Sequence, residues 1–218
     1  MDTTLDEWIR YVFDHPVTET AWHWDVDATY LTLPPAQAAT LIAQTFERSA
    51  ELLRPFTDAQ LNQGFWFLVS NTCSNYMFCL TDKSVALPMR QRALRSFLPL
   101  FRDVMAARCT ATLSHCSEPG SPLNSACFMW WDLLPYEGSW TVGLPPEPIH
   151  AEALAVLGAL LEIPHDACRE SALHGLGHLA FILPEAAAAV VDAFIERSSD
   201  LRPELLDYAR QARIGHVL

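Results

Sequence analysis

The sequence of 218 residues predicts an all-α protein, and three observations support this fold class. Hydrophobic residues make up 50% of the chain and aromatic residues 11%, enough to build a sizeable core. Most of the chain has a helical pattern of apolar residues, punctuated by Pro, Gly, Asn and Ser. A convincing alternation of apolar and polar residues, typical of strands, does not occur. We expect about nine helices in one domain that covers residues 1–218.

The N-terminal half contains three predicted helices. The first covers residues 5–15 and ends before a proline. Residues 17–34 are irregular and rich in tryptophan, so we expect a loop that lies over the body. A second helix runs from Pro35, which suits a first-turn position, to about Leu53. A third begins at a Thr57 or Asp58 cap and continues to about Leu80, and its apolar circumference places it centrally.

The middle of the chain contains two further predicted helices and a break between them. The first covers about 87–109 and has an apolar side, an arginine-bearing side and a bend at Pro99. The turn-rich stretch 114–125 separates it from a helix over 126–135. Residues 136–148 are rich in Pro and Gly and mark a possible subdomain boundary.

Four helices with short connections follow that boundary. They cover residues 149–163, 165–183, 184–198 and 202–215. Connections of only a few residues favour antiparallel neighbours.

The segment HDACRESALHGLGHLAFILPEAAAAVVDAFIE, within 165–197, resembles a HEAT repeat. An arginine near the start of one helix is followed by an Ala-Leu-x-x-Leu-Gly core, a short turn and a second apolar helix. Residues 87–109 resemble the first half of such a unit less closely. The resemblance implies a HEAT-like stack of antiparallel helix pairs, an α-α superhelix whose concave face typically binds partners. It implies no reaction. Some HEAT-like proteins are DNA glycosylases with a basic groove, and the acidic total charge of this chain departs from that pattern.

The net charge of the chain limits the classes of molecule that it is expected to bind. A formal net charge of −12 repels nucleic-acid phosphate, so we do not expect DNA or RNA binding and instead expect a protein partner, plausibly a basic one. The start of the sequence carries acids where a secretory signal carries bases, and no apolar run of about 18 residues occurs. We therefore expect a cytoplasmic protein without a membrane span.

Six cysteines are expected to be reduced thiols that pack as small hydrophobic side chains: Cys73, Cys79, Cys109, Cys116, Cys127 and Cys168. The spacing C-x-x-C does not occur, which argues against a zinc ribbon or a thioredoxin-type motif. Cys73, and Cys116 beside His115, lack a flanking signature of a catalytic cysteine, so we do not predict a cysteine nucleophile.

The stretch CRESALHGLGHLAF contains the one candidate metal site. Glu170, His174 and His178 follow one another at intervals of four and share a helix face, which could offer two nitrogens and a carboxylate to a divalent metal. Another helix could supply the third ligand instead, for example through Asp192 or Glu196. That face lies opposite the leucines, so we expect the histidines to point to solvent, a groove or another subunit. A plain packing helix without a cofactor is the alternative that we favour. Gly175 and Gly177, costly in a helix, predict close approach of another segment.

Two further groups are candidates for partner binding. Arg92, Arg95 and Arg102 form a basic stripe that could bind a carboxylate-rich partner, a phosphate or the chain's own acids, and we favour a solvated face with ion pairs. Two tryptophan pairs either anchor loops to the core or form a binding surface: Trp22 with Trp24, and Trp130 with Trp131.

The function predicted from these features is protein interaction without catalysis, as an adaptor, inhibitor or immunity-type protein that binds a macromolecule through a groove or its Trp-rich loops. The alternative is a metal-binding protein or metal-dependent enzyme that uses the face with Glu170, His174 and His178.

Overall fold

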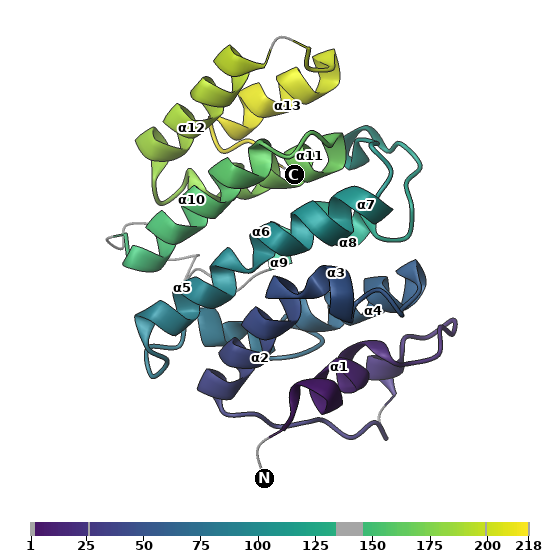
Figure 1. Ribbon diagram of the computed structural model, residues 1–218. Coiled ribbons are helices and arrows are strands. Elements are labelled where there is room, and N and C mark those ends of the chain that lie inside the picture. The colour runs from purple at the N-terminus through teal and green to yellow at the C-terminus, as the bar shows by residue number, and fades with distance from the viewer. Residues whose placement is uncertain (1–2, 26, 134–145, 199, 218) are drawn as a thin grey trace.

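The computed structural model describes residues 3–25, 27–133, 146–198 and 200–217. Within these ranges every regular element is a helix, which confirms the predicted all-α class. Figure 1 shows the helices stacked along an elongated body, with the N-terminal end at the bottom and α12 (Pro184–Arg197) and α13 (Pro203–Ala212) at the top. One cluster of buried hydrophobic residues extends from Trp8 to Val217. No helix in the described ranges is long and apolar enough to cross a membrane.

The first helices begin at the predicted signals but end earlier than expected. Helix α1 (Leu5–Phe13) and helix α4 (Asp58–Val69) both start with a capping box, and Thr57 is the cap of α4. Helix α2 (Pro35–Glu47) is followed by a separate short helix, α3 (Ser49–Leu52).

The prediction that the third helix continues to Leu80 is wrong. Helix α4 ends at Val69, and the 3₁₀ helix η2 (Tyr76–Leu80) follows as a separate element. The hydroxyl of Ser70 accepts the backbone N–H of Thr72 at 3.4 Å, a local bond that competes with helix continuation.

The predicted helix over 87–109 is present as a chain of consecutive helical pieces. These are α5 (Leu87–Arg95), α6 (Phe97–Leu100), the π-helical turn η3 (Phe101–Met105) and α7 (Ala106–Arg108). The helix is interrupted on both sides of Pro99, the position of the predicted bend. Proline has no N–H to donate to the helical hydrogen bonds. The next stretch contains the 3₁₀ helix η4 (Ser114–Cys116), α8 (Asn124–Phe128) and α9 (Trp130–Leu133). The expected count of about nine is therefore too low, since long predicted helices are split.

The four predicted C-terminal helices are all present. Helices α10 (Pro148–Leu161) and α11 (Asp166–Leu179) precede α12 and α13, and three of the four have proline in the first turn. The predicted boundary over 136–148 falls mainly on 134–145, outside the described residues, and stays a prediction. Helix α10 packs against α5 as well as α11, so helices before and after this segment share the core.

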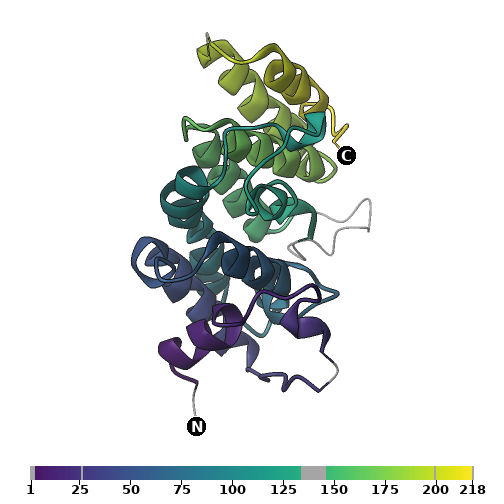
Figure 2. The same ribbon diagram turned by 90° about the vertical axis from the view of Figure 1, so that its right-hand side faces the viewer.

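Helix α11 is enclosed by its neighbours, and this determines the candidate site. It packs against α8, α9, α10, α12 and α13. In the side view of Figure 2 the green part of the chain lies between the teal helices and the yellow end of the stack. A Cβ on Gly175 would lie 2.6 Å from Leu157 Cδ2, and one on Gly177 would lie 2.5 Å from Val217 Cγ1. The predicted close approach at both glycines is confirmed.

Candidate metal centre

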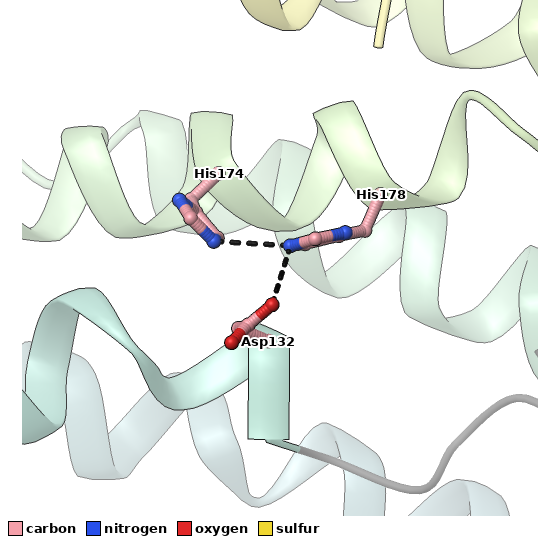
Figure 3. A group of neighbouring side chains, drawn as sticks. All are labelled: Asp132, His174 and His178. Atoms are coloured by element: carbon pink, nitrogen blue, oxygen red, sulfur yellow. Dashed lines mark hydrogen bonds and ion pairs between the residues drawn. The ribbon is translucent and has the colours of Figure 1, made fainter. Parts of the chain in front are cut away.

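Two histidines of α11 and one aspartate of α9 converge on a common point. Nε2 of His174 lies 3.0 Å from Nε2 of His178, and Nε2 of His178 lies 3.2 Å from Oδ1 of Asp132. One ligand atom from each residue lies within 4.8 Å of the other two. Figure 3 shows the two rings descending from α11 towards the carboxylate, which rises from α9. The histidines are one helical turn apart and α9 packs against α11, so the backbone itself brings the three groups together.

The three side chains form a gradient from core to surface. The residue His174 is 1% exposed, whereas the side chains of His178 and Asp132 are 23% and 35% exposed. The expectation that both histidines point outward is therefore wrong for His174. A helix with a single buried face would turn His174 outward, but α11 is covered on several sides. The group is closed on the His174 side and open on the Asp132 side.

A tyrosine from α13 fixes the ring of His174. Nδ1 of His174 lies 2.7 Å from the hydroxyl of Tyr208, and the ring of Phe128 stands edge-on to the imidazole at 4.7 Å between centroids. When Nδ1 donates its proton to the Tyr208 hydroxyl, Nε2 carries a lone pair that points at His178 and Asp132. A hydrogen bond at the far nitrogen is what orients metal-binding histidines in proteins.

Burial keeps both imidazoles neutral. Desolvation, and after it the neighbouring His178, lowers the pKa of His174 to about 3. Desolvation also lowers the pKa of His178, against the opposing charge of Asp132. The pKa of the Tyr208 phenol is raised, first by burial and then by Glu170 and Asp132, so its hydroxyl stays protonated. Neutral imidazole is the form that binds metal ions.

The arrangement fits a small divalent cation. Two ligand atoms bound to a tetrahedral zinc at about 2.0–2.1 Å lie roughly 3.3 Å apart. The two nitrogens here lie 3.0 Å apart, and Nε2 of His178 lies 3.2 Å from the Asp132 oxygen. Two imidazole lone pairs cannot face each other at 3.0 Å without a proton or a cation between them. Two histidines and one aspartate suit zinc, iron(II) or manganese(II). Among the described residues the group has these three ligands, so an ion held by them would keep positions for water or a substrate.

Asp132, rather than Glu170, completes this group, which corrects the predicted ligand set. Glu170 lies one turn before His174, and its buried carboxylate accepts the backbone N–H groups of Ser114 and His115, each at 2.9 Å. In the sequence Asp132 directly follows two tryptophans. Nothing in the sequence, however, indicates that its short helix packs on α11.

The predicted tryptophan pairs belong mostly to the interior. Trp130 and Trp131 are 0% and 1% exposed, so the expectation that they form part of a partner-binding surface is wrong. Trp22 is half-buried and stacks on His15 at 3.8 Å between ring centroids. Trp24, 54% exposed, is the one member of the two pairs that offers a large apolar surface.

The arginine stripe pairs with acids of the same chain. Arg92 binds Glu47 and Arg95 binds Glu152, at 2.7 and 2.8 Å. Arg102 binds its neighbour Asp103 at 2.7 Å. The arginines are half-exposed, and the structure agrees with the interpretation as a solvated face with ion pairs.

Comparison of the chain with protein-family models, with curated proteins and with solved structures gives no significant match, so the functional argument rests on the geometry above.

Proposed function

We propose that the protein binds one divalent transition-metal ion between Asp132, His174 and His178 and acts as a metal-dependent enzyme. The observation that carries the proposal is the convergence of the two Nε2 atoms and the Asp132 carboxylate, with Tyr208 on the far nitrogen of His174. Two neutral imidazoles and one carboxylate place a single negative charge opposite the ion, so a divalent complex keeps a net positive charge. A metal in such a site activates a bound water or polarises a substrate oxygen.

The residues around the proposed metal centre have different roles. His174 and Tyr208 form a rigid buried wall, because their side chains are held in the core between α11 and α13. His178 and Asp132 face the open side and can adjust to the ion. Among the described residues the group offers three ligands, whereas structural zinc sites are closed by four, which favours a catalytic over a purely structural ion.

Metal titration of chelator-treated protein tests this proposal. We expect one Zn²⁺ or Co²⁺ per chain by calorimetry, with Co²⁺ giving the visible absorption of a bound ion. His178→Ala should weaken binding by about 100-fold or more, because it removes one of three ligands. His23→Ala is the control, since this histidine lies in the 3₁₀ helix η1 (Trp22–Trp24) near the N-terminal end, outside the group. Failure of the wild type to bind Zn²⁺, Co²⁺, Mn²⁺ or Fe²⁺, or unchanged binding by His178→Ala, overturns the proposal.

Partner binding through an interaction surface, the role first predicted from the sequence, stays a prediction, as does the resemblance to HEAT repeats. Its remaining support is a set of large exposed side chains, among them Trp24, Tyr30 and Phe78 in the N-terminal part of the chain. A cavity of about 390 Å³ is lined in part by Tyr30 and Phe78. The buried tryptophans and the internally paired arginines give it no support.

A further inference from the structure

A second group of reactive side chains is anchored one turn earlier on α11. Sγ of Cys116 lies 3.3 Å from Nε2 of His115, and Nδ1 of His115 lies 2.6 Å from Oε1 of Glu170. A thiol, an imidazole and a carboxylate thus follow one another within hydrogen-bonding distance. This order of nucleophile, base and orienting acid is the arrangement that activates cysteine nucleophiles.

The buried carboxylate determines which way the proton on His115 points. Glu170 is fully buried and accepts the backbone N–H groups of Ser114 and His115 as well as the ring contact. A carboxylate accepts, so Nδ1 of the ring is the donor in this contact. Nε2 of the neutral imidazole is then free to accept the proton of the Cys116 thiol.

The segment that presents the thiol is fixed on both sides. The backbone N–H of Leu113 donates to Glu118 at 2.9 Å, and Arg202 pairs with that carboxylate. Ser117 has φ 58°, the one left-handed residue other than glycine in the described ranges, and it turns the chain directly after the thiol. Strained backbone of this kind is concentrated at functional sites. The ring of His115 also stacks on Tyr208, with 4.3 Å between centroids and 19° between planes.

The local hydrogen bonds restrict the type of electrophile. The N–H groups of Cys116, Ser117 and Glu118 all donate to the carbonyls of Leu113 and Ser114. These three N–H groups therefore cannot stabilise the oxyanion that acyl transfer would form. Attack on a disulfide sulfur needs no such donor, because the charge leaves on a thiolate.

The charges around the thiol restrict the electrophile further. The pKa of Cys116 is raised, first by the limited desolvation of its exposed side chain and then by Glu118, Glu204 and Glu170, while Arg202 acts in the opposite direction. The resting side chain is therefore a thiol that needs a base to react. The acidic surroundings repel anions and favour an uncharged or cationic reagent.

We propose that Cys116 is a nucleophilic thiol that exchanges with small uncharged or cationic disulfides, with His115 as its base and Glu170 as the positioning residue. Nε2 of His115 takes the thiol proton while Sγ attacks one sulfur of the disulfide. The disulfide S–S bond breaks, a new S–S bond joins Cys116 to one half, and the departing thiolate takes the proton back from the imidazolium. One disulfide is exchanged for another, so no further oxidant is needed. This site does not depend on the proposed metal centre.

The other cysteines provide internal references. Cys79, Cys109, Cys127 and Cys168 are buried. Cys73 is half-exposed, and its Sγ lies 3.8 Å from the Thr72 hydroxyl rather than beside a base. The serine variant of Cys73 is therefore the matched control for the serine variant of Cys116.

The first experiment follows the reaction of the native protein with 4,4′-dithiodipyridine at pH 7. We expect a fast phase of one thiol per chain that disappears in Cys116→Ser and persists in Cys73→Ser. His115→Gln should slow this phase by about tenfold or more, since it removes the base. A fast phase that survives Cys116→Ser, or a loss of less than about threefold in His115→Gln, overturns the proposal.

The pH profile of the wild type tests the base without a variant that could disturb folding. A thiol that passes its proton to a neighbouring base should react at a rate that rises by clearly less than about tenfold per pH unit below the pH of ordinary thiol ionisation. A rate that climbs about tenfold per pH unit up to ordinary thiol ionisation contradicts the proposal. For each disulfide we divide the rate constant of the protein by that of free N-acetylcysteine amide. This ratio should be larger for dicationic cystamine than for the dianionic 5,5′-dithiobis(2-nitrobenzoate). The reverse order contradicts the class of disulfide.

Discussion

The hydroxyl of Tyr208 lies 2.7 Å from Nδ1 of His174, and both side chains are buried between α13 and α11. The same tyrosine carries the stacked ring of His115 on its face. One aromatic side chain therefore positions an imidazole of the proposed metal centre and the imidazole beside Cys116.

Tyr208→Phe should weaken metal binding while leaving the fold intact. The change keeps the ring and removes the acceptor for the Nδ1 proton, so the ring of His174 loses its fixed orientation. We expect a loss of about 10- to 100-fold in Zn²⁺ affinity, measured by calorimetry. The lost hydrogen bond should lower the free energy of unfolding by about 1 kcal/mol. Tyr30→Phe, which removes a hydroxyl far along the chain, is the control, and equal affinities in the two variants would contradict this role of Tyr208.

The stability of the metal-free protein should fall as the pH is lowered from about 6.5 towards 3. Burial lowers the pKa of His174 to about 3, whereas an imidazole in the unfolded chain titrates near 6.5. Between these values the unfolded chain binds protons that the folded chain does not, so acid favours unfolding. The contribution of one such group reaches about 1.4 kcal/mol per pH unit.

Urea unfolding at several pH values in the presence of a chelator measures this effect. His174→Gln should show a shallower decline of the free energy of unfolding with falling pH, whatever its stability at pH 7. Gly158→Ala, which changes no ionisable group, should keep the wild-type slope. An identical slope in His174→Gln would show that His174 titrates normally in the folded protein.

Gly175→Ala should destabilise the protein by about 1–3 kcal/mol, the cost of overpacking a core. Its Cβ would lie 2.6 Å from Leu157 Cδ2 and 2.7 Å from Trp131 Cγ, at the contact that seats α9 and α10 on α11. Gly158→Ala in α10 is the matched control, because its Cβ would meet Val190 at an ordinary 3.5 Å. Helix propensity should make that variant neutral or more stable by up to about 1 kcal/mol. Equal effects of the two changes on thermal unfolding would argue against the tight contact.

The sequence predicts the C-terminal helices well because their signals are local. Prolines in the first turns mark the starts of α10, α12 and α13, and the two glycines of α11 correctly indicate close packing. The pattern of apolar residues does not show how many neighbours a helix has. The pattern places His174 and Glu170 on an outer face of α11. Both are buried, because neighbouring helices cover α11 on several sides.

The two candidate sites need contacts between distant parts of the chain. Asp132 meets the histidines of α11 only because the short helix α9 packs there. The pair formed by His115 and Cys116 is visible in the sequence, but its orienting partner, Glu170, lies 55 residues away from His115. Residue spacing identifies the i, i+4 histidines, and tertiary packing supplies the acid for each site.

The packing of Val217 against Gly177 determines at which end of the chain a purification tag should be placed. The chain turns at Gly215, with φ +75°, and Val217 then lies on α11 next to the residue that precedes His178. Figure 1 shows the C-terminal end beside α11 and the N-terminal end at the opposite extreme of the stack. A polyhistidine purification tag fused after this end would bring competing imidazoles close to the proposed metal ligands, whereas an N-terminal tag would keep them far away.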